Sequence, residues 1–305
     1  MPTWFIFAIA MSLTYSVINH IDHSLLSRYF KEGGVEVLLV FSALFSCFGI
    51  PYAIYMEPDV LTIEWKNMLI MLLAAGLNTT LLYCYLKAMT TDEPTVVVLY
   101  YQLVPVIALI LGYFILEEVI SKVEFIAMII VITGTTLASF KKTDLQQITF
   151  RWRTAGLMLI ATTCWATETT IGKIVILDES VYHSVFWESI LMVGVGICIL
   201  IFKPQYRKSF QHSWKVNSGV ILSVMVLSEA LYAAGNTLSA KATELKEVSI
   251  VMLLQPTQTI FVFIIGIGLA LLFPTIYTEK LTQFDLFQKI AAIAITTYGS
   301  YLLLM

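Results

Sequence analysis

The sequence predicts an all-α integral membrane protein with ten transmembrane helices, arranged as two inverted five-helix repeats. The prediction rests on the apolar composition, on ten apolar segments of spanning length, and on a similarity between the two halves of the chain. Of the 305 residues, 58% are hydrophobic and 13% are charged, and the mean hydropathy is +0.84. A soluble domain has about 45–50% apolar and about 25% charged residues, so this composition indicates a lipid environment. The net charge of −3 offers no basic surface for a nucleic acid partner.

Ten segments have the length that a membrane span requires, which is about 20 mostly apolar residues. They lie near 3–21, 34–54, 67–87, 94–115, 123–140, 154–175, 183–202, 217–240, 247–272 and 285–304. The first segment has neither the positive start nor the small-residue cleavage site of a signal peptide, so we expect it to be retained as a span. The longest polar connections, 141–153 and 203–215, are too short to form a soluble domain. Four cysteines lie within apolar runs and are predicted to be small buried side chains: Cys47, Cys84, Cys164 and Cys198.

The second half of the chain repeats features of the first at an offset of about 150 residues. Pro105 pairs with Pro256, and Asn78 with Glu229. We therefore predict two domains, residues 1–145 and 146–305, with five helices each. Because five is odd, the second repeat enters the membrane upside down relative to the first, as in many secondary transporters.

The paired prolines predict a helix break in the fourth helix of each repeat. Proline removes a backbone donor and frees the carbonyl one turn back, at Tyr101 and Met252. In lipid, a freed carbonyl must find a partner or line a wet cavity. Pro105 and Pro256 are thus candidate hinges, and the alternative is a kink satisfied by neighbouring helices without any ligand.

Several local patterns accompany the proline breaks. A glutamine lies close to each proline, at Gln102 and at Gln255, a glutamate follows the broken helix at Glu117 or Glu118 and at Glu279, and a glycine lies in each fifth helix, at Gly134 and Gly299. Tyr15 precedes "NHIDHSLL" and Trp165 precedes "TETTIGK". With these features the chain resembles the drug/metabolite transporter (DMT) superfamily, and in particular its EamA-like members.

The resemblance implies a ten-helix basket around a central cavity, alternating access, and export or exchange of small metabolites. It also implies that helices 1, 3, 4, 6, 8 and 9 line the cavity while helices 5 and 10 pack outside it. Two features depart from the pattern: His23 stands where the second repeat has Lys173, and about ten residues are inserted before Glu279.

The orientation in the membrane stays open at this point. Thirteen Lys and Arg residues lie in loops on one side and five on the other, which by the positive-inside rule places both termini outside. The family resemblance implies that both termini are cytoplasmic.

Polar side chains within the spans are the candidate binding residues, because an ionisable group in the membrane is costly and usually functional. On three helices they recur at i, i+3, i+4 and i+7, so they share one helix face. The candidate substrate-binding residues are Tyr15, Asn19, Asn78, Tyr100, Gln102, Trp165, Glu168, Glu229, Tyr232, Asn236, Gln255 and Gln258. Glu229 and Glu168 are also candidates for proton coupling. We expect Glu188 to serve helix packing and Asp22 to be solvated near a helix end, and Lys173 is the clearest base.

These features predict a secondary active transporter, an exporter or exchanger, for a small organic metabolite, with an amino-acid-like solute as one candidate. The acid-leaning lining favours neutral, zwitterionic or cationic solutes. The alternative is a membrane protein without transport activity: a channel, a receptor or an intramembrane enzyme. The chain contains no HExxH, GxSxG or P-loop motif. We therefore expect no enzyme activity, metal, cofactor or ATPase subunit. We expect a monomer or homodimer in the cell (inner) membrane.

Overall fold

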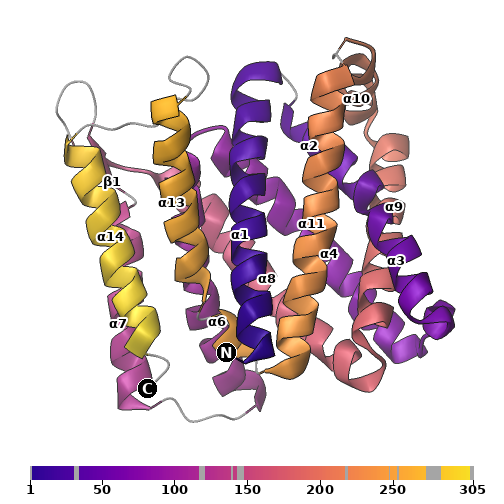
Figure 1. Ribbon diagram of the computed structural model, residues 1–305, viewed down its shortest axis with the longest axis horizontal. Helices are drawn as coiled ribbons and strands as arrows, with labels where there is room; N and C mark the ends of the chain where they lie inside the picture. The colour runs from indigo at the N-terminus through magenta and orange to yellow at the C-terminus, as the bar shows by residue number, and fades with distance from the viewer. Residues whose placement is uncertain are drawn as a thin grey trace.

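The computed structural model describes residues 2–30, 34–116, 121–138, 140–142, 148–216, 219–246, 248–252, 254–272 and 283–302. The chain folds as a bundle of helices with one short antiparallel strand pair (Figure 1). The helices of the first half are α1 (Thr3–Ser24), α2 (Gly34–Phe45), α3 (Gly49–Met56), α4 (Trp65–Met89), α5 (Pro94–Leu99), α6 (Leu103–Leu116) and α7 (Lys122–Ala138). Those of the second half are α8 (Trp152–Asp178), α9 (Val181–Phe202), α10 (Pro204–Val216), α11 (Gly219–Leu245), α12 (Val248–Met252), α13 (Gln255–Leu272) and α14 (Gln283–Leu302). Short turns η1 (Leu25–Tyr29), η2 (Ser46–Phe48), η3 (Pro58–Leu61) and η4 (Tyr100–Gln102) extend or join these helices, and the strands are β1 (Phe140–Lys142) and β2 (Ile148–Phe150).

Six helical segments of the described chain are long and apolar enough to cross a membrane. They are Thr3–Tyr29, Gly34–Met56, Trp65–Met89, Pro94–Leu111, Val181–Phe202 and Gly219–Leu245. Two shorter apolar helices, Phe125–Leu137 and Pro256–Leu272, coincide with two further predicted spans. The segments predicted at 154–175 and 285–304 lie on α8 and α14, which are helical but less apolar. The all-helical membrane class is therefore confirmed, while the ten-span count stays a prediction.

Lipid exposure explains several side chains that a soluble protein would bury. Phe287 is 75% exposed, Phe202 74% and Leu271 69%. Cys47 and Cys198 are also exposed, so the prediction of four buried cysteines is correct only for Cys84 and Cys164. The reason is that an apolar run in a membrane helix includes positions that face lipid, where no protein atoms cover them.

The connection predicted as a polar loop at 203–215 is instead the helix α10. Pro204 is its first residue, where the missing backbone donor costs nothing. Phe210 and Trp214 lie four residues apart on one face, and both rings lie 6.5 Å from the ring of Phe41 on α2. Their contact with α2 explains how a sequence with so many polar residues folds as a helix.

The fourth predicted span of each half is interrupted just before its proline. In the first half, α5 ends at Leu99 and the tighter turn η4 separates it from α6, which carries Pro105. In the second half, α12 ends at Met252 and α13 begins at Gln255, next to Pro256. Both prolines are buried. The described backbone thus contains a break at each of the two predicted positions.

Helices of the two halves pack against one another in reciprocal pairs. The first helix α1 lies against α11, and α4 lies against α8 (Figure 1). At one side of the bundle, α7 packs against α14. A Cβ on Gly134 would lie 2.6 Å from Thr296 Cγ2, and a Cβ on Gly299 would lie 2.8 Å from Val131 Cγ2. Glycine at these two positions therefore permits the close approach of α7 and α14.

The two ends of the described chain lie at the same end of the bundle. In Figure 1, α1 begins and α14 ends at the lower edge. This placement is expected for a chain that crosses the membrane an even number of times, as the sequence predicts. The glutamates Glu117, Glu118 and Glu279, and the inserted residues before Glu279, lie outside the described residues.

Candidate functional site

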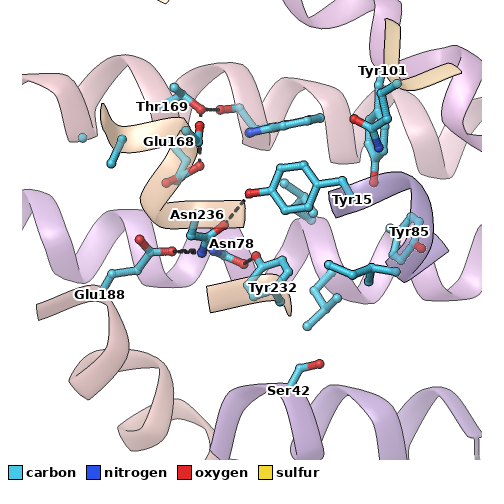
Figure 2. Close-up of a pocket in the computed structure, with 18 of the residues that line it drawn as sticks. Tyr15, Ser42, Asn78, Tyr85, Tyr101, Glu168, Thr169, Glu188, Tyr232 and Asn236 are labelled. Carbon is cyan, nitrogen blue, oxygen red and sulfur yellow. Dashed lines mark hydrogen bonds between the residues drawn. The ribbon is translucent and has the colours of Figure 1, made fainter. Parts of the chain in front are cut away.

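A cavity of about 120 Å³ lies inside the bundle, between helices of both halves. Its wall comes from α1, α2, α4, α8, α9, α11 and α13 and from the turn η4. Most of the predicted binding residues line it: Tyr15, Asn19, Asn78, Trp165, Glu168, Glu229, Tyr232, Asn236 and Gln258. Figure 2 labels Tyr15, Asn78, Glu168, Tyr232 and Asn236 among them. The helical faces deduced from sequence spacing are therefore brought together on one internal surface.

Glu188 of α9 is the centre of a hydrogen-bonded group in this wall. The side-chain amides of Asn78 and Asn236 donate to its Oε1 at 2.9 and 3.3 Å. The same amides accept through their oxygens, Asn78 from the hydroxyl of Tyr232 at 3.2 Å and Asn236 from the hydroxyl of Tyr15 at 2.6 Å (Figure 2). Because each amide uses its NH₂ group and its oxygen on different partners, the orientation of both amides is fixed.

We expected a packing role for Glu188, and the structure also places it in the cavity wall. Its position, seven residues after the start of α9 at Val181, suggested a place near a helix end. Three other helices, α1, α4 and α11, contribute to the hydrogen-bonded group around it, and only their tertiary arrangement brings two asparagine amides to one carboxylate. Glu188 lines the cavity together with the predicted residues.

A second polar group lies around Asp22. Tyr85 donates its hydroxyl to Asp22 Oδ2 at 3.1 Å and accepts from the Asn19 amide at 2.8 Å. Gln258 Nε2 donates to Asn19 Oδ1 at 3.0 Å. We expected Asp22 to be solvated, but it is 9% exposed and lines the cavity. The reason is that the first span continues through η1 to Tyr29, which places Asp22 well inside it.

The remaining two carboxyl groups of the cavity have fewer fixed partners. Ser42 of α2 donates its hydroxyl to Glu229 Oε1, and Glu229 is 7% exposed. Thr169 donates to Glu168 Oε2 at 3.5 Å, the limit for a hydrogen bond. The carboxylate of Glu168 is therefore held less tightly by its donor than the carboxylate of Glu229.

Aromatic rings form much of the rest of the wall. Trp165 packs edge to face against Tyr101 at 4.8 Å and against Tyr15 at 6.3 Å between ring centroids. Tyr101 lines the cavity, while the predicted Tyr100 does not. Both residues belong to η4, and neighbouring residues on a helical turn point in different directions. Sequence reasoning identified the turn but selected Tyr100, the neighbour that does not line the cavity.

The predicted glutamines of the broken helices take different places. Gln102 is fully buried outside the cavity wall, and its Nε2 donates to Thr259 Oγ1 of α13 at 3.3 Å. It therefore joins the broken helix of one half to that of the other. Gln258 lines the cavity, while the side chain of Gln255 lies outside the described part of the structure. Pro105 and Pro256 are not in the cavity wall.

Basic side chains do not contribute to the described wall of the cavity, which contains no Lys, Arg or His. Lys173, the base expected there, donates from Nζ to the backbone carbonyl of Lys246 at 3.0 Å. Within the described ranges, no three His, Cys, Asp or Glu side chains are grouped closely enough to hold a metal ion.

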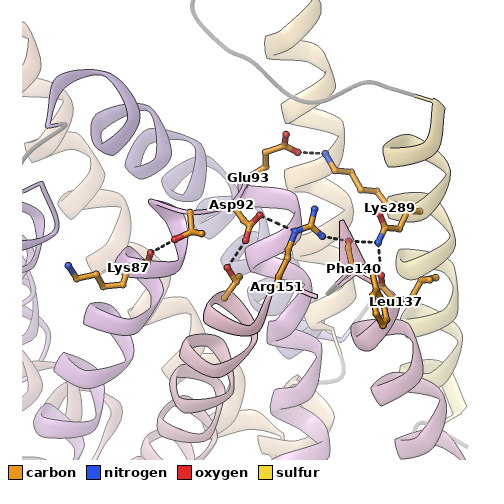
Figure 3. A network of polar contacts seen from close by, with 10 residues as sticks. Lys87, Asp92, Glu93, Leu137, Phe140, Arg151 and Lys289 are labelled. Atoms are coloured by element: carbon orange, nitrogen blue, oxygen red, sulfur yellow. Dashed lines mark hydrogen bonds and ion pairs between the residues drawn. The ribbon is translucent and has the colours of Figure 1, made fainter. Parts of the chain in front are cut away.

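A network of ion pairs joins the two halves where α4 ends and α8 begins (Figure 3). Arg151 pairs with Asp92 at 3.0 Å, and Thr154 donates to the other Asp92 oxygen at 2.5 Å. Next to this pair, Lys289 of α14 contacts Glu93 at 2.5 Å. Asp92 and Glu93 are neighbours in the sequence. Their contacts therefore hold the loop before α5 against α8 and α14 of the second half.

A smaller contact joins the halves where α4 begins and α8 ends. The Asn67 amide and the backbone N–H of Glu64 donate to Glu179 Oε1 at 3.0 and 3.2 Å. The Asn67 bond first, and then the Glu64 bond, lower the pKa of the Glu179 carboxyl below its ordinary value. Polar contacts therefore tie α4 to the second half at both of its ends.

Comparisons with known proteins agree with this architecture. The model of the EamA-like transporter family matches residues 3–140. A crystal structure of another protein aligns with a TM-score of 0.61 over 99% of this chain and 94% of that chain, at 13% sequence identity. At that identity the likeness shows the fold alone, and it extends along nearly the whole chain. The comparison with curated proteins gives no match.

The family match confirms the resemblance that the sequence motifs suggested, and the long apolar helices agree with it. Members of this family are small-molecule transporters of the membrane, and the described helices are those of a multi-pass integral membrane protein. Residues 3–140 of the chain are therefore similar to the EamA-like transporter family, which is part of the DMT superfamily.

Proposed function

We propose that the protein is a secondary active transporter that moves a small organic solute by alternating access at the central cavity. In this proposal the chain crosses the membrane of the cell ten times, as two inverted five-helix repeats, residues 1–145 and 146–305. The cavity residues named above bind the solute, and Pro105 and Pro256 act as hinges.

The observation that carries the proposal is a buried polar cavity whose wall is shared between the two halves. Glu188 of the second half accepts from Asn78 of the first, and Tyr15 of the first donates to Asn236 of the second. A relative motion of the halves would break and remake these contacts. Transport by alternating access requires such a site at the boundary between repeats.

The reciprocal packing of helices supports two repeats related by a twofold axis. Counted as spans, α1 and α4 are the first and third of their half, and α8 and α11 are the first and third of theirs. The contacts α1–α11 and α4–α8 then exchange with one another under the twofold, and the α7–α14 contact maps onto itself. A duplicated and inverted fold predicts this pattern.

The helix breaks support a moving element on each side of the cavity. Irregular backbone is tolerated at membrane depth where it is buried in protein or lines a cavity, and η4 supplies Tyr101 to the wall. The bond from Gln102 to Thr259 connects the two broken helices. Both helices would therefore move together rather than independently.

The energy source is proposed to be a proton gradient or the exchange of a second solute, because the chain carries no P-loop for ATP. Glu229 and Glu168 are the proposed proton carriers. Each has a single described hydrogen-bond donor, Ser42 or Thr169. Protonation of either carboxyl would therefore disturb few other contacts.

The proposal is tested by flux into liposomes that contain the purified protein. We expect saturable, strongly temperature-dependent uptake that Pro105→Ala and Pro256→Ala reduce while the protein still assembles. Pro204→Ala, at the start of α10 and away from the cavity, is the matched control and should transport normally. A flux that does not saturate would identify a channel, and loss of assembly in both hinge variants would identify structural kinks.

A further inference from the structure

We infer that the solute of the central cavity is a small organic cation, a protonated amine, and that Glu188 is its anchor. This inference rests on the proposed transport function and specifies the class of solute, which the family match does not define. It is argued from the charge, the hydrogen bonding and the size of the cavity.

Charge is the first argument. The described wall carries four carboxyl groups, those of Asp22, Glu168, Glu188 and Glu229, and no basic side chain. Lys173, which would have balanced them, is held by the carbonyl of Lys246. A carboxylate or phosphate entering this space would meet like charge in a poorly screened environment, whereas an ammonium group would be attracted.

The hydrogen bonding of Glu188 is the second argument. Both asparagine amides donate to Oε1, and among the described residues none donates to Oε2. The amides therefore fix the carboxylate in place and leave one oxygen for a ligand. A charge-assisted bond from an ammonium N–H to a carboxylate oxygen is about twice as strong as a neutral one.

The aromatic residues of the wall support a cation with an apolar body. Tyr15, Trp165 and Tyr232 all line the cavity, and the two tyrosines are bonded to the amides that hold Glu188. Aromatic faces attract ammonium groups, most strongly where water is excluded. They also provide apolar contact for the carbon skeleton of an amine.

The third argument is independent of the first two: the side-chain oxygen of a buried amide has no hydrogen-bond partner in the described structure. Gln258 lines the cavity and is 1% exposed, and within the described structure its Oε1 has no hydrogen-bond partner. A buried acceptor without a partner is costly. A solute with several N–H donors would provide one. This oxygen therefore points to the same donor-rich ligand as the free oxygen of Glu188.

The size of the cavity limits the solute. Its volume is about 120 Å³, and an apolar cavity of about 150 Å³ is large enough for benzene. Because the cavity is somewhat smaller than this benchmark, a primary amine on a short chain or on a single ring is the upper limit of what it can hold. A nucleotide, a peptide or a sugar phosphate exceeds it.

The inference is tested with three probes of nearly equal shape: benzylamine, benzyl alcohol and benzoate. Binding to the full-length purified protein at neutral pH is measured by calorimetry and by the shift of the unfolding temperature. We expect benzylamine to bind at least about tenfold more tightly than benzyl alcohol, and benzoate to give no shift. Equal binding of all three probes, or preferred binding of benzoate, overturns the inference.

Variants locate the anchor. Glu188→Gln should lower the affinity for benzylamine by about tenfold and leave benzyl alcohol unchanged, which also serves as the folding control. Glu244→Gln, at the exposed end of α11, should leave both affinities unchanged. If Glu188→Gln does not fold, Glu168→Gln should weaken benzylamine selectively. Unchanged benzylamine binding in a folded Glu188→Gln protein contradicts the assigned anchor.

Flux measurements separate this inference from the proposed function. Saturable liposome uptake of a neutral or anionic solute, without competition by benzylamine, would support transport and overturn the cation. Selective benzylamine binding without flux of any solute would support the cation site and overturn the transport function.

Discussion

The buried ion pair between Asp92 and Arg151 yields the most direct stability prediction. It connects the loop after α4 to the start of α8, so its loss should loosen one end of the boundary between the halves. The perturbation is Asp92→Ala, which removes the carboxylate that also accepts from Thr154. The guanidinium of Arg151 then loses this carboxylate and keeps its bond to the carbonyl of Phe140 at 2.6 Å.

The magnitude follows from the burial of the pair. The side chains of Asp92 and Arg151 are 9% and 11% exposed, so the figure of about 0–1 kcal/mol for surface pairs does not apply. Removing one partner of a buried pair costs about 3–5 kcal/mol. Because Arg151 retains the Phe140 carbonyl, we expect the lower end, about 3 kcal/mol. At about 2–4 °C per kcal/mol, the unfolding temperature should fall by about 6–12 °C.

The assay is thermal unfolding of the purified variants in one detergent, followed by tryptophan fluorescence. Asp59→Ala is the matched control, since Asp59 is exposed in η3, and it should unfold within about 2 °C of the wild type. The double variant Asp92→Ala/Arg151→Ala also removes the positive charge that Asp92 balanced, and it should unfold at a higher temperature than Asp92→Ala alone. The reasoning is wrong if Asp92→Ala behaves like Asp59→Ala, or if the two substitutions are additive, because a coupled pair must give a non-additive cycle.

Two glycine substitutions test the packing that shapes the bundle and the cavity. In Gly134→Ala the added Cβ would lie 2.6 Å from Thr296 Cγ2 and 3.1 Å from the Thr296 backbone nitrogen. Overpacking destabilises a protein by about 1–3 kcal/mol, and the better helix propensity of alanine offsets about 1 kcal/mol of this loss. We expect a net loss of up to about 2 kcal/mol, measured as a lower unfolding temperature. In Gly235→Ala the Cβ would lie 2.6 Å from Tyr15 Cε1. The tyrosine ring should therefore move away from Asn236 and lose its hydrogen bond. We expect solute flux or binding to fall by about tenfold, which is the effect of one lost hydrogen bond. Gly76→Ala, with no atom within 4 Å of the new Cβ, is the control for both; a loss of similar size in this control would contradict the steric explanation.

The sequence alone was sufficient for the membrane class, for most of the spans and for the two helix breaks. Each of these depends on local properties: the apolar length of a segment, or a proline that cannot donate a hydrogen bond. The faces of α1, α8 and α11 were also correct, because a regular helix fixes which residues share a side. Tyr15, Glu168 and Glu229 accordingly line one cavity.

The predicted residues that do not line the cavity lie where the helix is irregular or where a distant element supplies a partner. Tyr101 replaces Tyr100 because η4 turns more tightly than an α-helix. Gln102 bonds to Thr259 and so faces the other broken helix rather than the cavity. Lys173 donates to the backbone carbonyl of Lys246, which is 73 residues away in the sequence.

What the sequence determined is therefore the set of polar groups placed inside the membrane, since burying them in apolar runs is costly enough to mark them without a structure. What only the tertiary structure decided is how these groups are paired. Two asparagines, one from each half, meet at Glu188, and Asp22 is covered by Tyr85. Hydrogen bonds between distant helices depend on where those helices cross, and no local pattern of residues encodes that position.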